Sequence, residues 1–178
     1  MNPKRIFKNI FLSLLLVFVC LSISSAQITI QDINWQLSDA VGRKRLPFVK
    51  VKGISVKPDG KINEKIRIIV SVANKGEKTV EGLVIRYALN FRMVNLKSPG
   101  DTAIWSVPFR IEELRISKIE PSRASEVKII KTGINKELKK LRNNGFWINA
   151  IGLEIMIEPK KGDDLKKIIY QSSIAVKR

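Results

Sequence analysis

Two long stretches of strict apolar alternation constrain the fold more than any other feature of this chain. In the first stretch every second residue is apolar: Ile66, Ile68, Val70 and Val72. The second follows a short polar connection at 74–77 and repeats the alternation: Leu83, Ile85, Tyr87, Leu89 and Phe91. Because successive side chains of a β-strand point to opposite faces, this period of two predicts two strands that each bury one face. The short connection allows either a hairpin or a crossing from one sheet to another.

Shorter alternating stretches along the rest of the chain predict seven to nine strands in total. The additional strands are expected at 27–37, 48–56, 103–111, 114–119, 127–132, 147–157 and 168–176, with turns at 58–61, 120–123 and 160–164. The alternation shifts once near Asp32, which indicates a β-bulge in the first of these strands. Pro108 cannot donate to a ladder, so its strand is expected at the edge of a sheet. Many short strands separated by turns predict an all-β, antiparallel β-sandwich.

One segment, at 135–142, departs from the strand pattern. Ile134, Leu138 and Leu141 fall at helical spacing there. Asn135 is a residue type that caps helix starts, and the Asn-Asn-Gly sequence at 143–145 can end a helix in a left-handed conformation. The sequence therefore predicts one short helix that crosses an end of the sandwich.

The N-terminus has the order of a secretory signal peptide, which we place at 1–26. A basic start and an apolar run at 10–23 are followed by small residues at 24–26. The run is shorter than the roughly 20 residues that cross a bilayer, so cleavage is expected rather than retention as a membrane anchor. A lipid anchor on Cys20 is disfavoured because no small residue precedes that cysteine. The mature protein is expected in the periplasm or outside the cell.

Cleavage would leave one domain, 27–178, which contains no cysteine. Without disulfides or thiolate metal sites, its stability must come from packing, and a chain of this length can bury a substantial core. The whole chain has 33 Lys and Arg against 16 Asp and Glu; losing Lys4, Arg5 and Lys8 leaves 30 cations and a net charge of +14. This excess predicts attraction to anionic surfaces, or otherwise a merely solvated basic surface.

The segments at 65–76 and 79–89 resemble the central strands of bacterial and archaeal immunoglobulin-like domains of the cell-adhesion-related, CARDB-like type. In those domains a strand ending in Asn-x-Gly, here Asn74-Lys75-Gly76, is followed by a strand that crosses to the other sheet. The turn at 119–121 is similar to the Pro-containing turn that precedes a middle strand there. The helix at 135–142 and the basic lead-in before Ile54 depart from the family.

This resemblance covers about 54–176 and implies an immunoglobulin-like antiparallel β-sandwich in an extracytoplasmic setting. It transfers no active site, since such domains mostly act as spacers or as adhesion and binding modules. We accordingly expect no catalytic residue and no cofactor.

The chain contains no histidine, which removes Ser-His and Cys-His nucleophilic pairs and the commonest zinc ligands. Two adjacent carboxylate pairs remain, Glu112-Glu113 and Asp163-Asp164. Strand alternation or a turn points the two members of each pair apart, so we interpret them as solvated surface acids rather than as the acid and base of a hydrolase.

No metal site is expected either. The segment 59–64 has oxygen donors but lacks the spacing of an EF-hand loop, and Lys57, Lys61 and Lys65 oppose a cation there.

Five aromatic residues lie on apolar strand faces: Trp35, Trp105, Trp147, Phe91 and Tyr87. Their parity favours a place in the core over an exposed platform for sugar stacking.

Basic residues form two groups that are candidates for binding anions. The first lies in a loop and on one strand face: Arg43, Lys44, Arg45, Lys50 and Lys52. The second belongs to the predicted helix: Lys136, Lys139, Lys140 and Arg142. Only if the fold gathers these groups on one side would they form a single patch.

These observations predict an exported, non-enzymatic β-sandwich module that binds a partner protein or an anionic envelope component, such as lipid head groups or an acidic glycan. One alternative is a periplasmic assembly or scaffold subunit that pairs through an edge strand. Another is a hydrolase with a site made only of carboxylates. Nucleic acid is the less favoured partner, because no exposed aromatic residues are interleaved with the basic ones.

Overall fold

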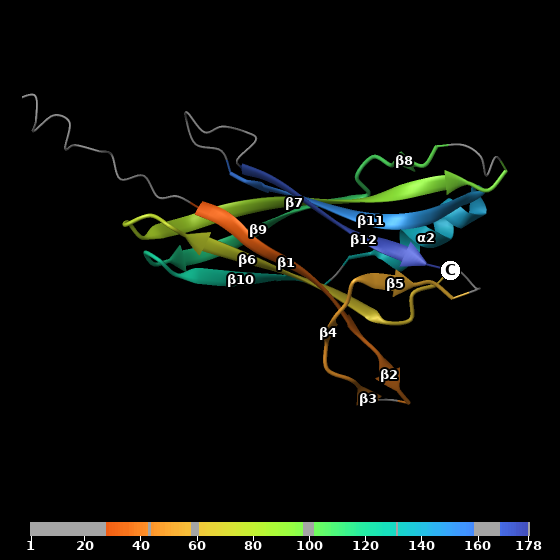
Figure 1. The fold of residues 1–178 in the computed structure, drawn as a ribbon, viewed down its shortest axis with the longest axis horizontal. Helices are drawn as coiled ribbons and strands as arrows, with labels where there is room; N and C mark the ends of the chain where they lie inside the picture. Colours follow the sequence, from red (N-terminus) through yellow and green to blue (C-terminus); the bar gives the residue numbers. More distant parts are fainter. Residues whose placement is uncertain are drawn as a thin grey trace, which may run out of the picture.

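In the part of the chain that the structure describes, two β-sheets pack face to face and are accompanied by one short helix (Figure 1). The computed structural model describes residues 28–42, 44–57, 61–97, 102–130, 132–158 and 168–177. The expected signal peptide, the turn residues 58–60 and the charged turn at 160–164 lie outside these residues.

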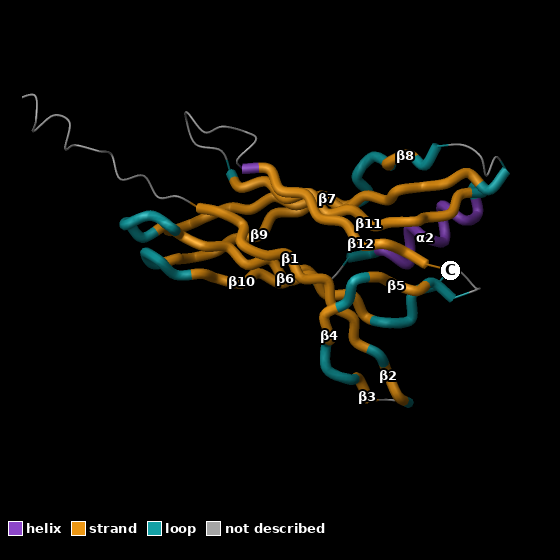
Figure 2. The backbone as a smooth tube through the Cα atoms, viewed as in Figure 1, coloured by secondary structure: helices purple, strands orange, loops and turns teal. Residues whose placement is uncertain are grey.

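The first sheet has the strand order β10-β6-β1-β4. These strands are β10 (Ala124–Ile129), β6 (Lys65–Asn74), β1 (Ile28–Ser38) and β4 (Val49–Lys50). The second sheet has the order β5-β12-β11-β7, and both β8 and β9 pair with β7. Its strands are β5 (Gly53–Ser55), β12 (Ile169–Lys177), β11 (Phe146–Ile157), β7 (Val80–Asn95), β8 (Ile104–Trp105) and β9 (Arg110–Ile119). A small ribbon of β2 (Ala40–Val41) and β3 (Lys44–Arg45) projects from the sandwich (Figure 2).

The core lies between the two sheets and is formed by one face of each long strand. All the residues that define the two alternating stretches are buried: Ile66, Ile68, Val70, Val72, Leu83, Ile85, Tyr87, Leu89 and Phe91. Seven of the described strands have six or more residues, and they form the two layers. The predicted all-β sandwich is therefore confirmed.

The connection between β6 and β7 is a crossing from one sheet to the other, not a hairpin. Asn74, at the end of β6, is only 1% exposed. Its Nδ2 donates to the carbonyl oxygens of Lys78 (2.7 Å) and Ile119 (3.1 Å), and its Oδ1 accepts from the amide of Gly76 (3.0 Å). One asparagine thus satisfies the backbone groups that the turn leaves unpaired.

Strand β1 pairs with β6 along its length, and its register shifts between Ile30 and Asp32, as the predicted bulge requires. Trp35 of β1 is buried, and its Nε1 donates to Oγ of Ser172 in β12 at 3.0 Å. This bond joins the two sheets along one side of the sandwich.

The predicted continuous strand at 48–56 is wrong. β4 pairs with β1 in the first sheet, whereas β5 pairs with β12 in the second. The chain crosses from one sheet to the other at 51–52. Because the alternation of residue types continues through this crossing, the sequence pattern does not reveal it. The pairing of β5 with β12 is parallel, while the other described pairs are antiparallel.

The predicted strand at 103–111 is interrupted, and the core position predicted for Trp105 is wrong. Both β8 and β9 lie at the same edge of β7, on either side of a break at 106–109. Pro108 has no amide to donate, and within the break the hydroxyl of Ser106 accepts a hydrogen bond from the Phe91 amide (3.0 Å). Trp105 pairs with Arg92 on the outer face of the second sheet and is 49% exposed. Val107 and Ile111 are likewise exposed, at 83% and 69%.

The helix α2 (Ile134–Asn143) confirms the predicted one at 135–142. Ile134 and Leu138 are buried, and Leu141 packs against the core. Gly145 has a φ of 81°, so the left-handed stop is as expected. The cap differs, because Gly133 occupies the N-cap position with a φ of 68° and the side chain of Asn135 bonds elsewhere.

Candidate anion-binding groove

A groove of about 420 Å³ lies at the start of α2, between the helix, the segment leading into β6 and strand β3. Its lining comes from β3, from the segment 62–66, and from the segment that runs from Ile130 into the helix. The lining residues are Arg45, Ile62, Asn63, Glu64, Lys65, Ile66, Ile130, Thr132, Gly133, Ile134, Asn135 and Lys136. Three elements that are distant in sequence thus meet here.

Asn135 fixes the segment before β6 against the helix. Its Oδ1 accepts from the amide of Ile62 at 3.0 Å, and its Nδ2 donates to the carbonyl of Ile62 at 2.7 Å. Ile62 and Ile134 are both buried, so the base of the groove rests on the core. Because both ends of its side-chain amide are hydrogen-bonded to Ile62, Asn135 does not cap the helix.

The helix start contributes to the electrostatics of the groove. Within the described residues no side chain caps it, and its amides at Lys136 and Glu137 share the carbonyl of Gly133. The first turn of a helix carries a partial positive charge, which favours anions.

The described lining of the groove includes three basic residues, Arg45, Lys65 and Lys136, and one carboxylate, that of Glu64. All three basic residues are exposed. Among the described residues neither Lys65 nor Lys136 forms an ion pair, and Arg45 donates to the carbonyl of Ser38 over 3.4 Å. A neighbouring groove shares Ile62, Asn63, Glu64 and Asn135 and adds Lys57, Lys61 and Asp39 to its lining. Cations therefore outnumber acids over the whole region.

The structure brings together one member from each predicted basic group, Arg45 and Lys136. Nζ of Lys50 instead lies 3.9 Å from Oδ2 of Asp32, and Nζ of Lys140 pairs with Oε1 of Glu137 at 2.8 Å. The other candidates that the structure describes are exposed but do not line the groove: Lys44, Lys52, Lys139 and Arg142. Arg43 lies outside the described residues.

Sequence reasoning missed Lys65 as a member of the site. In the sequence, the positive charges of Lys57, Lys61 and Lys65 were interpreted only as evidence against a calcium site at 59–64. The same three lysines could have indicated an anion site, because what repels a cation attracts an anion.

The carboxylates of β9 are engaged by other side chains. Glu112 accepts hydrogen bonds from the Tyr87 hydroxyl (2.6 Å) and from Arg110, while Glu113 accepts from Arg86 (2.8 Å). The two acids pair with different cations, consistent with the expected opposite orientation of neighbours in a strand. Asp163 and Asp164 lie outside the described residues.

Within the described ranges, no three His, Cys, Asp or Glu side chains gather closely enough to hold a metal ion. In the same ranges, no helix has the length and apolar character needed to cross a membrane.

The fold and the groove define a β-sandwich protein with a basic surface groove. No family model matches the sequence, and no curated protein matches it. Similar solved structures include the C-terminal domain of wzt, 9% identical with a TM-score of 0.38 over 87% of this chain and 76% of that one. An immunoglobulin-like protein from Pseudomonas aeruginosa is 9% identical, with a TM-score of 0.37 over 85% of this chain and 98% of that one.

A third similar structure is the β-D-glucoside glucohydrolase of Trichoderma reesei, 16% identical with a TM-score of 0.37. The match covers 85% of this chain but only 19% of that enzyme. No function is assigned from these likenesses.

Proposed function

We propose that this protein is an exported, non-catalytic binding module that binds a phosphate or carboxylate group of an envelope component at the basic groove. The observation that carries the proposal is the convergence of Arg45, Lys65 and Lys136 from three separate elements. The signal peptide expected from the sequence supports an envelope setting for the anion.

The groove offers complementary ways to hold such a group. The guanidinium of Arg45 can donate two parallel hydrogen bonds to a carboxylate or phosphate, and the two lysines add mobile point charges. The partial charge of the helix start adds to both. Because all three side chains are exposed, solvent screens them, so binding should be modest and should weaken with salt.

Pairing through an edge strand is supported less well. In the described first sheet β10 is the edge beyond β6, and Glu126 and Lys128 on it are exposed. Charges on an edge strand oppose pairing with another chain.

A carboxylate hydrolase is also supported less well. Glu112 bonds to Tyr87 and Arg110, and Glu113 to Arg86. Both carboxylates are thus already bonded to arginine side chains of the same sheet rather than directed together at a shared substrate position.

The test uses the chain 27–178 with two anionic probes, vesicles of phosphatidylglycerol and soluble alginate, to distinguish a lipid phosphate from a glycan carboxylate. We expect binding to one of them at about 0.05 M salt and its loss at about 0.5 M, where exposed charges are screened. The double variant Lys65→Ala/Lys136→Ala should bind roughly thirtyfold more weakly, at about 1 kcal/mol per lysine near a charged surface.

The matched control is Lys75→Ala/Lys78→Ala in the turn between β6 and β7, which removes the same charge away from the groove. It should bind as tightly as the unaltered protein. Equal weakening of both double variants would show that net charge alone attracts the probe, and no binding to either probe at low salt would refute the proposal.

A further inference from the structure

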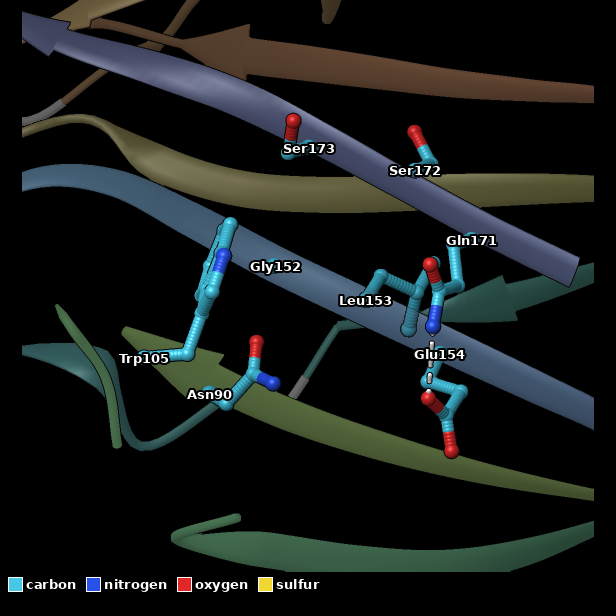
Figure 3. A pocket seen from close by; sticks show the side chains of 8 residues that line it. All are labelled: Asn90, Trp105, Gly152, Leu153, Glu154, Gln171, Ser172 and Ser173. Atoms are coloured by element: carbon cyan, nitrogen blue, oxygen red, sulfur yellow. Dashed lines mark hydrogen bonds between the residues drawn. The ribbon is translucent and has the colours of Figure 1, made fainter. Parts of the chain in front are cut away.

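A second groove, of about 400 Å³, lies on the outer face of the second sheet (Figure 3). Its floor crosses three adjacent strands, because Asn90 of β7 pairs with Gly152 of β11, which in turn pairs with Ser173 of β12. The next row places Glu154 beside Gln171. The half-exposed ring of Trp105 stands over Gly152 at one end of the groove.

Gly152 is what allows Trp105 and Asn90 to approach the sheet. A Cβ at this position would lie 2.1 Å from Oδ1 of Asn90 and 2.8 Å from Cζ3 of Trp105. Both distances are shorter than packed side chains tolerate, so any larger residue would displace the amide or the indole. The exposed tryptophan is thus seated in a fitted position on the sheet, with about half of its surface left open.

The polar side chains of the groove include several hydrogen-bond acceptors. The side-chain oxygen of Asn90 is buried and has no hydrogen-bond partner in the part of the chain that the structure describes, which is a costly state for a polar atom. Gln171 donates to Glu154 at 3.0 Å, which orients that carboxylate across the groove (Figure 3). The hydroxyl of Ser173 lies on the same face.

The charge of this groove is opposite to that of the molecule. Among the residues that the structure describes, no lysine or arginine lines it and Glu154 is its one charged lining residue, although the chain carries 33 Lys and Arg. An anionic ligand is therefore disfavoured here. Because the groove crosses the face of a sheet whose strands already pair with one another, it offers no free backbone to an extended peptide.

We propose that this groove binds a neutral saccharide, with one sugar ring stacked on Trp105 and its hydroxyl groups donating to Glu154 and Ser173. A sugar ring has an apolar C–H face that suits an aromatic surface and a rim of hydroxyls that suits an acceptor-rich lining. The volume falls within the range of small-molecule sites. This site shares no lining residue with the basic groove.

The test records two-dimensional ¹⁵N spectra of chain 27–178 during titration with neutral probes. The probes are tetrasaccharides of β-1,4-linked glucose, β-1,4-linked N-acetylglucosamine, α-1,4-linked glucose and β-1,4-linked mannose. The chain has three tryptophans, and the Trp105 indole signal is identified by its loss in Trp105→Phe. We expect this signal to move with at least one probe, while the signals of Trp35 and Trp147 stay in place.

The variant Trp105→Ala should weaken that binding by roughly tenfold or more, because it removes the aromatic face on which the sugar ring stacks. Ile104→Ala, the neighbouring exposed apolar residue of β8, is the matched control and should bind normally. Gly152→Ala should also weaken binding without altering a ligand contact directly.

Failure of all four probes to shift the Trp105 signal would overturn the proposal, as would normal binding by Trp105→Ala. Binding of a cationic peptide to Trp105 in place of any saccharide would also overturn it. The Lys65→Ala/Lys136→Ala variant should retain saccharide binding, and the binding should be insensitive to salt, so the outcome is independent of that for the basic groove.

Discussion

Tyr87 shows how a single residue couples the core to pH. Its ring is buried, and its hydroxyl donates to Glu112 at 2.6 Å. Burial, and then the bond to the carboxylate, raise the pKa of Tyr87 above its ordinary value, since both oppose the phenolate, and nearby Arg110 only partly offsets them. A pKa that is higher in the folded state stabilises the fold below about pH 10, the ordinary pKa of tyrosine. That contribution is lost as the pH rises through the folded-state pKa.

The change that tests this coupling is Tyr170→Phe, which leaves Tyr87 as the only tyrosine. We expect its phenolate absorbance to appear only above about pH 10, together with the loss of near-ultraviolet circular dichroism. Unfolding in denaturant should abolish the rise in the pKa of Tyr87, so that this tyrosine titrates near its ordinary pKa in the unfolded variant. A folded protein that titrates at or below pH 10 would contradict the hydrogen-bonded, buried position of Tyr87.

Among the secondary-structure elements, the strands that stay in one sheet along their whole length could be predicted from the sequence. The segments that change sheet or interrupt their pairing could not. β6 and β7 keep one face in the core throughout, so alternation identified them. At 48–56 the chain changes sheet, and at 103–111 its pairing with β7 is interrupted. In both segments the alternation of residue types continues, so the sequence pattern does not mark the change. Trp105 therefore carried the parity of a core residue while lying on the outer face. Which lysines meet at the groove depended on the same long-range pairing.

The link between α2 and β6 yields a prediction at this scale. Asn135→Ala removes both bonds to Ile62 and leaves a buried residue's backbone groups unsatisfied. We expect a loss of about 1–3 kcal/mol in the free energy of unfolding, measured by urea denaturation, and weaker binding of the anionic probe. The control Asn63→Ala alters an exposed residue of the same segment and should change stability by less than about 0.5 kcal/mol. Equal effects of the two variants would mean that the bonds of Asn135 do not hold the groove.

The whole molecule distributes its charge unevenly, and this decides how its two grooves relate. The basic groove uses β3, the start of β6 and the start of α2, whereas the acceptor-lined groove uses the outer faces of β7, β11 and β12. In Figure 1 β8 lies along the upper side of the sandwich and β3 at the lower end of the projecting ribbon. The described strands under the acceptor-lined groove pair with one another along their length, whereas coupling between sites requires an element with two discrete arrangements.

We therefore expect the two grooves to bind independently. A saturating neutral tetrasaccharide should change the dissociation constant of the anionic probe by less than about twofold, and the reverse titration should agree because coupling between two ligands is reciprocal. Isothermal titration in both orders measures this directly. Tenfold tighter binding of either ligand in the presence of the other would instead indicate one continuous surface, on which a single long glycan with both acidic and neutral sugars could lie.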